Sequence, residues 1–317
     1  MRAPQVLCFG EAMLELSRSD ADNWRMGVAG DTFNVAVYLR RLGCDAGFMT
    51  ALGADDFSAD IKAAMAREGL GAAWCLTHPT RAPGLYAIRL DEAGERSFAY
   101  WREASAARAF FDCEGAEALL AAAGGCGVLY LSAITLSLFD EAGRAQVAAL
   151  AKAGRRQGMR VAFDSNYRPR GWADAATAAR AIEGLAGAID IALPTFTDDV
   201  ALFGEPDPAA CAARWHAMGA SEVAVKLGEE GALVSAPEGS AVAPAQTVAQ
   251  VADTTGAGDS FNAGYLAARE AGHAPREAAA IGAALAAAVI RHPGAIIAPD
   301  AMPGTSPQAL LGSAQAA

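Results

Sequence analysis

Short β-rich segments alternate with longer segments of helical periodicity along most of this chain, and this alternation restricts the fold more than any other feature. The β-rich segments are 6–10, 47–52, 128–131, 161–164, 189–193 and 223–227, and the helical segments are 32–42, 59–68, 141–156, 207–218, 260–270 and 276–291. Strands separated by helices favour a parallel sheet covered by helices, because parallel neighbours need long crossover connections. The sequence therefore predicts an α/β fold.

One region breaks this alternation. Residues 84–91 and 95–102 alternate in polarity on either side of Glu92-Ala93-Gly94, a pattern that is typical of a β-hairpin. The segment 13–17 could add a strand to the same small sheet. A β-element inserted into an α/β domain often covers a binding site or forms a subunit contact, and an edge hairpin without a function is the alternative.

The composition is that of an acidic globular protein. Of the 317 residues, 53% are hydrophobic, which is ample for a large core, and the net charge of −11 argues against nucleic acid and anionic membranes as partners. The six cysteines have no CxxC spacing and are expected to be reduced. No signal-like segment is evident and 278–290 is too short to span a bilayer, so we expect a cytoplasmic protein. A site for an anionic substrate would have to be locally positive.

The string Asp-Thr-Thr-Gly-Ala-Gly-Asp at residues 253–259 is the strongest indication of chemistry, and a helical pattern follows it. Glycines let backbone N–H groups converge and a helix N-terminus adds partial positive charge, so the string predicts a cradle for an anion. In such a cradle Asp259 could take a proton from a hydroxyl while the N–H groups of Gly256, Ala257 and Gly258 hold phosphate charge. An ordinary glycine-rich turn with Asp259 near a helix N-cap is the alternative.

This string resembles the C-terminal signature of the ribokinase-like (PfkB) sugar kinases, in which the last Asp is the catalytic base. The similarity extends from residues 10–13 to residues 294–297. Five segments are similar to one branch of the family, the 2-keto-3-deoxygluconate (2-dehydro-3-deoxygluconate) kinases: Gly30-Asp31-Thr32-Phe33-Asn34, Pro83-Gly84-Leu85-Tyr86, Gly94-Glu95-Arg96, Tyr100-Trp101-Arg102 and Asp164-Ser165-Asn166-Tyr167-Arg168-Pro169. The Tyr-Trp-Arg and Asn-Tyr-Arg-Pro pieces are the ones that indicate this branch.

The resemblance implies a doubly wound αβα sandwich with a small β-sheet lid. It implies a single kinase domain over residues 1–304, with lid elements near 11–30 and 80–104, and ATP and Mg²⁺ as cofactors. We expect the small and polar segment 305–317 to fray at the C-terminus. A homo-oligomer is expected, either a dimer through the lid or a larger assembly.

The residues expected to contact the substrate are Gly30, Asp31, Asn34, Tyr86, Tyr100, Arg102 and Arg168. Gly30 allows close backbone approach, and Asp31 and Asn34 can hydrogen bond with sugar hydroxyls. Arg102 and Arg168 each present a planar fork that matches a carboxylate, so two arginines at one site indicate a sugar acid. The alternatives are a surface salt bridge for Arg102, a turn or cap contact for Arg168 and an N-cap for Asp31.

The residues expected to bind the nucleotide are Asn166, Arg168, Lys226, Gly228, Gly231, Gly256 and Gly258. The segment 226–231 follows a strand and resembles the nucleotide loop of the family, although a β-hairpin turn would explain it equally. Lys226 could contact phosphate or could simply be solvated. The family often has Asn-x-x-Glu for organising Mg²⁺, but this chain has Thr195 and Asp198 at the matching positions, so the metal ligands stay unknown.

These observations predict transfer of the γ-phosphoryl group of ATP to the C6 hydroxyl of 2-keto-3-deoxygluconate. A kinase for a neutral sugar of the fructose or ribose type is the first alternative. A catalytically silent sugar-sensing relative is the second, and the complete Gly-Ala-Gly-Asp motif argues against it because a binder needs no base.

Overall fold

The computed structural model describes residues 2–18, 23–90 and 96–316, and a mixed sheet of nine strands forms its centre. The strand order is β13-β12-β11-β10-β9-β8-β1-β4-β5. The bounds are β1 (Val6–Phe9), β4 (Ala46–Leu52), β5 (Cys75–Thr77), β8 (Val128–Ser132), β9 (Arg160–Asp164), β10 (Ile191–Ala192), β11 (Glu222–Lys226), β12 (Ala232–Ala236) and β13 (Gly239–Ala243). Neighbours pair in parallel from β5 to β11, and β12 and β13 are antiparallel additions.

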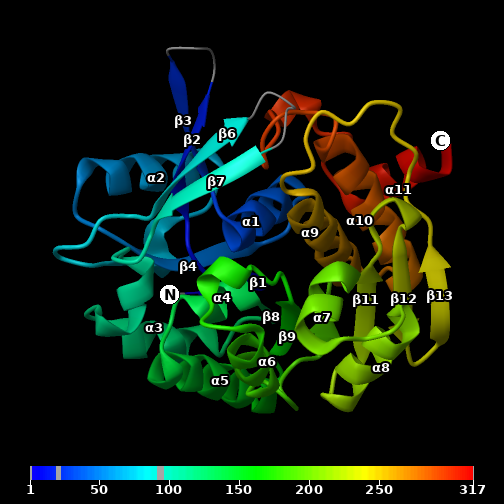
Figure 1. Cartoon of the computed structure of the whole chain (residues 1–317), viewed down its shortest axis with the longest axis horizontal. Helices are drawn as coiled ribbons and strands as arrows, with labels where there is room; N and C mark the ends of the chain where they lie inside the picture. Colours follow the sequence, from blue (N-terminus) through cyan, green and yellow to red (C-terminus); the bar gives the residue numbers. More distant parts are fainter. Residues whose placement is uncertain (1, 19–22, 91–95, 317) are drawn as a thin grey trace.

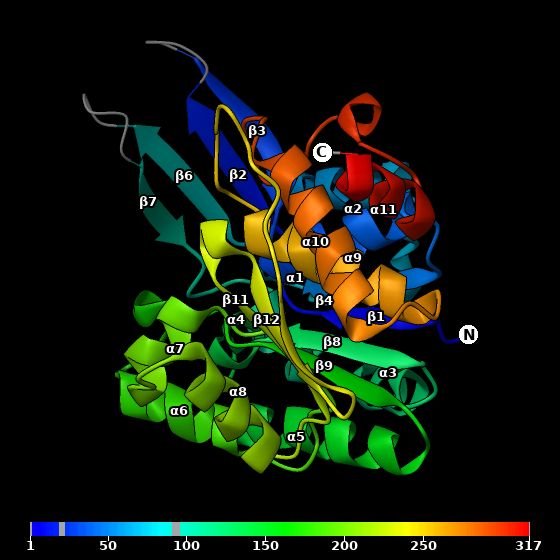
Figure 2. The same ribbon diagram turned by 90° about the vertical axis from the view of Figure 1, so that its right-hand side faces the viewer.

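Helices cover both faces of this sheet (Figures 1 and 2). One layer contains α1 (Asp31–Arg41), α2 (Asp56–Arg67), α9 (Ala257–Glu270), α10 (Pro275–Val289) and α11 (Pro307–Ala316). The other contains α3 (Ala116–Ala123), α4 (Ala133–Ser137), α5 (Glu141–Arg156), α6 (Ala175–Glu183), α7 (Phe196–Phe203) and α8 (Pro208–Ala217). Short 3₁₀ turns are η1 (Ala72–Trp74), η2 (Ala107–Asp112), η3 (Pro169–Gly171), η4 (Gly228–Glu230) and η5 (Pro299–Ala301). The predicted αβα sandwich is confirmed.

Alternation along the central strands divides the core into two layers. In β1, Val6 and Cys8 join the apolar cluster under α1 and α9, whereas Leu7 and Phe9 join the cluster under α3 to α8. Successive side chains of a strand point to opposite faces, so a strand buried on both sides is apolar at most positions, with polar exceptions such as Glu222 and Lys226 at the ends of β11. This explains why the apolar runs in the sequence predicted the central strands correctly.

A second sheet of four strands has the order β3-β2-β6-β7. Its strands are β2 (Met13–Arg18), β3 (Trp24–Ala29), β6 (Leu85–Leu90) and β7 (Arg96–Trp101). The predicted hairpin corresponds to β6 and β7, which pair antiparallel, while the turn predicted at Glu92-Ala93-Gly94 lies outside the described residues. Figure 2 shows this sheet projecting from one side of the α/β body.

The sequence pattern did not predict the strands β3, β5 and β13 or the helices α3, α4, α6 and α7, although the family resemblance placed lid elements near residues 11–30, where β3 lies. The first residues of β3 are exposed, so this strand lacks the apolar pattern of a core strand. The C-terminal segment that was expected to fray contains a helix: residues Pro307–Ala316 form α11, which contacts α10, and Leu310 is fully buried. Pro307 is also buried and Leu311 packs against the same apolar cluster, so a few apolar side chains place a segment that is otherwise small and polar.

No helix within these ranges is long and apolar enough to cross a membrane. All six cysteines are free, and four of them (Cys8, Cys113, Cys126 and Cys211) are buried. They pack as small apolar side chains, in agreement with the prediction that they are reduced.

Candidate active site

The candidate residues gather at the C-terminal ends of the parallel strands. The chain runs from β1 to its neighbour β4, and β8 lies on the other side of β1, so connections leave β1 and β8 in opposite directions. In open α/β sheets ligands bind at such a point, just beyond the strand ends. Glu11, Ser132, Asp164 and Lys226 lie at or just after the ends of β1, β8, β9 and β11, and the N-terminus of α9 contributes Asp259 to the same region.

The glycine-rich turn at the start of α9 requires its glycine. Gly256 is the N-cap residue with φ 76°, which other residues rarely adopt, and a Cβ atom there would lie 2.7 Å from the carbonyl oxygen of Ala295. Asp253 fixes the turn, because its carboxylate accepts hydrogen bonds from the N–H groups of Thr255 (2.7 Å) and Gly294 (2.6 Å). The Ala257 N–H donates to the carbonyl oxygen of Thr254 (3.2 Å), so it already has a partner within the turn.

Asp259 lies in the first turn of α9, and Asn34 Nδ2 of α1 donates to its Oδ2 at 2.7 Å. Burial, together with the charges of Asp31 and Asp164, raises the pKa of Asp259 to about 7, against the smaller lowering effects of the Asn34 hydrogen bond and of Lys226. A carboxylate whose pKa lies near neutrality is a suitable general base at physiological pH. The structure thus brings Asn34 and Asp259 together, although 225 residues separate them in sequence.

Gly30 and Asp31 lie where β3 leads into α1. A Cβ atom on Gly30 would be 2.1 Å from the carbonyl oxygen of Glu11, so only glycine fits this approach. Gly30 is also the N-cap, which means that the N-cap alternative for Asp31 was wrong. The Asp31 carboxylate accepts hydrogen bonds from Ser132 Oγ and from Asn166 Nδ2 (3.3 Å), and burial raises its pKa.

Arg102 follows β7 and forms an ion pair with Glu11, with 2.6 Å between Nη2 and Oε2. The Glu11 side chain is 1% exposed, so this is a buried pair and not the surface salt bridge considered as an alternative. The Tyr86 hydroxyl donates to the Glu15 carboxylate, and the ring centroids of Tyr86 and Tyr100 lie 5.8 Å apart. The tyrosine contacts lie within the small sheet, and the Arg102–Glu11 pair links the end of β7 to the segment between β1 and β2.

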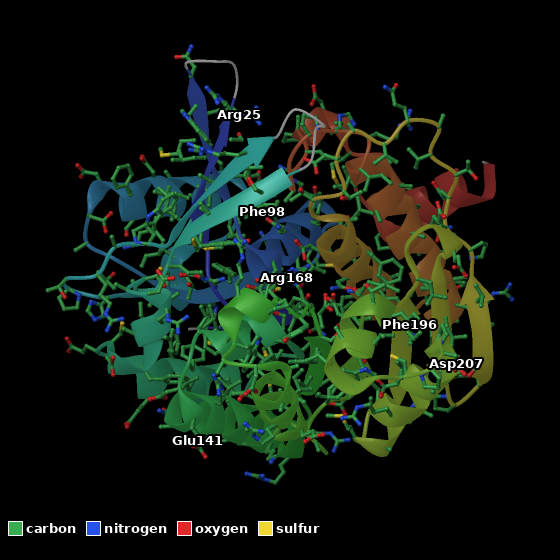
Figure 3. All side chains as sticks on the ribbon, viewed as in Figure 1. Arg25, Phe98, Glu141, Arg168, Phe196 and Asp207 are labelled. Atoms are coloured by element: carbon green, nitrogen blue, oxygen red, sulfur yellow. The ribbon has the colours of Figure 1, made fainter. Side chains whose placement is uncertain are left out.

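Arg168 has a different environment from Arg102. Its side chain is 58% exposed, and Nη1 donates to Asp198 Oδ2 (3.2 Å) and to the carbonyl oxygen of Tyr167 (2.8 Å). Arg170 donates to the carbonyl oxygen of Phe98 (2.7 Å), so this loop contacts β7 of the small sheet (Figure 3). The two arginines that were expected to bind one carboxylate are therefore each paired with a carboxylate of the chain.

Lys226 is buried, so the alternative of a solvated lysine was wrong. Its Nζ donates to Asp164 Oδ2 (2.8 Å) and Asn262 Oδ1 (3.1 Å). Asn262 Nδ2 in turn donates to Asp164 Oδ2 (2.6 Å) and to the hydroxyl oxygen of Tyr130 (3.0 Å). Four elements of the fold thus meet in one polar network.

The segment after β11 forms a tight turn into β12. Gly228 and Gly231 have φ 65° and 101°, and the Leu227 N–H donates to the carbonyl oxygen of Gly231 at 2.8 Å. β11 and β12 pair antiparallel across this turn, so the hairpin explanation is correct. A role of Gly228 and Gly231 in nucleotide binding is compatible with the turn and stays a prediction.

Residues 195–198, which match the Asn-x-x-Glu metal motif of the family in position, contact other residues of the chain. Thr195 is the N-cap residue of α7, and Asp198 Oδ2 accepts a hydrogen bond from the Tyr167 N–H (3.1 Å) in addition to Arg168. Asp199 is fully buried and accepts a hydrogen bond from Trp215 Nε1 at 2.6 Å. No group of three or more His, Cys, Asp or Glu side chains in the described ranges could hold a metal ion.

Sequence reasoning missed several members of the site: Glu11, Ser132, Tyr130, Asp164 and Asn262. Glu11 and Asp164 lie in segments that carried the family resemblance, and Asn262 lies three residues after Asp259, so their positions were visible in the sequence. Their partners were not, because each pairs with a residue far away along the chain.

Residues 3–302 match the profile of a family described as pfkB family carbohydrate kinase. The chain belongs to this family of carbohydrate kinases. The predicted family and the predicted class of enzyme are thereby confirmed. The chain is 37% identical over 311 residues to the 2-dehydro-3-deoxygluconokinase of Dickeya dadantii (strain 3937), covering 96% of this chain and 100% of the relative. It is 39% identical over 306 residues to the enzyme of the same name from Escherichia coli (strain K12), covering 94% and 99%.

Solved structures agree on the fold of this pfkB family member. The crystal structure of a PfkB protein from Polaromonas sp. JS666 has a TM-score of 0.82 at 29% identity and covers 98% of this chain and 100% of that one. The crystal structure of 2-dehydro-3-deoxygluconokinase from Thermotoga maritima has a TM-score of 0.85 at 20% identity and covers 99% of both chains. The second likeness shows the fold alone.

Proposed function

We propose that this protein is an ATP-dependent sugar-acid kinase that phosphorylates the C6 hydroxyl of 2-keto-3-deoxygluconate. The observation that carries the chemistry is Asp259, a carboxyl with a pKa of about 7 in the first turn of α9, beside the glycine-rich turn. The observation that favours this substrate is the full-length similarity to 2-dehydro-3-deoxygluconokinases.

In the proposed reaction Asp259 accepts the proton of the attacking hydroxyl. Asn34 orients this carboxylate through the 2.7 Å hydrogen bond, and its donation favours the ionised form that acts as the base. The N–H groups of Gly256 and Gly258 and the positive end of α9 stabilise negative charge on the phosphoryl group as it transfers. Asp31 would accept a hydrogen bond from another sugar hydroxyl.

ATP would bind across the strand ends, with Lys226, Asn166 and Arg168 near its phosphates and the Gly228–Gly231 turn beside the nucleotide. Mg²⁺ usually keeps several waters and binds through substrate phosphates and only one or two carboxylates. A site of this kind fits the described residues, in which no all-protein metal cluster occurs. When bound with ATP, the ion would neutralise phosphate charge, and no protein ligand is assigned to it.

The substrate carboxylate would bind Arg102, Arg168 or both. A guanidinium has five N–H donors, so pairing with one carboxylate leaves others for a ligand. Glu11 and Asp198 would then orient the two guanidinium groups, while Tyr86 and Tyr100 would line the approach from the small sheet. This arrangement favours a sugar acid over a neutral sugar.

ADP release with Mg-ATP tests the proposal, comparing 2-keto-3-deoxygluconate with fructose, ribose and gluconate at equal concentrations. We expect strong preference for the keto-deoxy acid and a loss of most turnover in Asp259→Asn with little change in sugar binding. Preference for a neutral sugar would keep the kinase chemistry and overturn the role of the two arginines. Absence of ADP release with every sugar would overturn the kinase proposal itself.

We also propose that the protein assembles through its small sheet. Trp24, Met26 and Trp101 are large apolar side chains of this sheet with exposed fractions of 39%, 45% and 59%. Trp24 and Met26 lie on the edge strand β3 and Trp101 on the opposite edge strand β7, and exposed apolar side chains at the edges of a sheet favour a protein contact. Light scattering of the purified protein should give the mass of a dimer or larger assembly, and Trp101→Lys should lower that mass; a monomeric wild type would contradict the proposal.

A further inference from the structure

A network of buried polar side chains lies beneath the candidate base. It consists of Tyr130 from β8, Asp164 from the end of β9, Lys226 from the end of β11 and Asn262 from α9, each less than 10% exposed. Asn262 is one turn of α9 after Asp259. A Cβ atom on Gly258 would lie 3.7 Å from Lys226 Nζ, so the ammonium group lies directly against the first turn of the helix.

Stability alone does not explain these buried charges. Removing an ammonium and a carboxylate from water costs several kcal/mol per ion, and replacing a buried ion pair by apolar side chains is often neutral or stabilising. The chain has three lysines, Lys62, Lys152 and Lys226, and only Lys226 is buried. Its position at the junction of β9, β11 and α9, which together shape the site, indicates a role in the reaction.

We propose that Asp164, Lys226 and Asn262 form a positioning network that fixes the first turn of α9 and sets the charge that Asp259 faces. This inference rests on the proposed function, in which Asp259 is the base. Asn262 connects the network to the helix, since its amide donates to Asp164 and accepts from Lys226 at 2.6 and 3.1 Å. A shift of this turn would move both Asp259 and the N–H groups of the glycine-rich turn.

The charged and titratable groups that act on Asp259 come from both helical and strand elements of the fold. They are Asp31 and Tyr38 of α1, Tyr86 of β6, Tyr130 of β8, Asp164 after β9 and Lys226 of β11. Lys226 is the cation of this set and lowers the pKa of Asp259, whereas Asp31 and Asp164 raise it. Lys226 and Asp164 thus act on Asp259 in opposite directions, although they are bonded to each other.

Two neutralising variants test this proposal through the acid limb of the pH profile of kcat/KM, which follows the ionisation of the base in the free enzyme. Lys226→Met should move the limb to higher pH, and Asp164→Asn should move it to lower pH, each by about half a unit or more. The double variant, which buries no charge at either position, should return close to the wild-type limb. Lys152→Met, which changes an exposed lysine of α5, is the matched control and should not move it.

A merely structural role gives a different result. Equal loss of kcat/KM at every pH, with no movement of the acid limb in either single variant, would overturn the proposal. If Lys226→Met does not fold, Asp164→Asn and the double variant still decide between these outcomes, with circular dichroism to verify folding.

A second readout separates this proposal from the proposed function. The carboxyl carbon of Asp259 can be titrated by ¹³C NMR in the protein without substrate, with Asp259→Asn used to assign its signal. Opposite shifts of this titration in Lys226→Met and Asp164→Asn would support the network even if no tested sugar were phosphorylated. Unchanged titration in both variants would overturn it even if the protein proved to be the proposed kinase.

Discussion

Asp259→Asn should inactivate the protein and also make it more stable above neutral pH. The structure raises the pKa of Asp259 from 3.8 to about 7, chiefly because the carboxyl is buried, so the native state binds its proton more tightly than the unfolded chain does. Stability therefore falls as the pH rises from about 4 to about 7, and the full cost of the ionised carboxylate applies above pH 7. An asparagine has no such cost, and its side-chain oxygen can still accept the hydrogen bond from Asn34.

The magnitude follows from the size of the shift. The pKa of Asp259 is about three higher in the native state than in the unfolded chain, and each step of one corresponds to about 1.36 kcal/mol. For a fully buried carboxyl, the ionised form would therefore lower the free energy of unfolding by roughly 4 kcal/mol. The Asp259 residue is only partly shielded from solvent, so screening reduces this to about 2 kcal/mol, which corresponds to a rise of about 3 °C in the Tm of a chain of 317 residues.

Urea unfolding of wild type and Asp259→Asn at pH 5 and pH 8 measures this effect. We expect a stability gain for the variant that is larger at pH 8 than at pH 5, together with a loss of turnover of about 10²–10⁴-fold. A gain that does not change with pH, or a variant less stable than wild type at pH 8, would refute the raised pKa and the reasoning based on burial. A base held at such a cost is typical of a stability–activity trade-off.

Three further predictions concern the neighbours of Asp259 and the remainder of the chain. Asn34→Leu removes the donor that favours the ionised base, so the acid limb of kcat/KM should move above its wild-type position near pH 7; movement to lower pH would contradict the assignment. Arg102→Ala and Arg168→Ala should each raise KM for the sugar acid by about 10- to 150-fold, equivalent to about 1.5–3 kcal/mol per charge-assisted hydrogen bond, and equal loss on a neutral sugar would indicate structural damage. Leu310→Ala should lower the free energy of unfolding by about 2–4 kcal/mol in urea titrations because Leu310 is fully buried, whereas no change would mean that α11 does not dock.

The sequence allowed prediction of those parts of the molecule that depend on local pattern. The central strands were visible because burial on both faces makes most positions apolar, as in β1 and β8. Asp259 was visible because the full string Asp-Thr-Thr-Gly-Ala-Gly-Asp resembles the signature of the family, whereas a lone carboxylate after a glycine-rich turn would suit an ordinary helix N-cap. The small sheet was only half predicted, since the mostly exposed strand β3 carries no apolar pattern.

Long-range pairing explains what could not be predicted. Arg102 was expected to face a ligand, but its guanidinium pairs with Glu11, which lies 91 positions earlier in the sequence. Lys226 was a candidate for phosphate or solvent, and the structure buries it against Asp164 and Asn262. Such partners depend on which strand ends are neighbours, and strand order is not encoded in local periodicity.

Charge balance at the site links these corrections to the proposed reaction. The sequence required a locally positive site for an anionic substrate, yet Arg102, Arg168 and Lys226 are each paired with a carboxylate of the chain. Asp31 and Asp259 add further negative charge, and the raised pKa of each reflects burial together with the other nearby carboxylates. An arriving sugar acid and ATP would therefore meet a site with little spare positive charge. Positive charge supplied with the nucleotide, as Mg²⁺ would supply it, compensates for this deficit, so sugar-acid binding should strengthen when Mg-ATP is present and weaken when metal-free ATP replaces it.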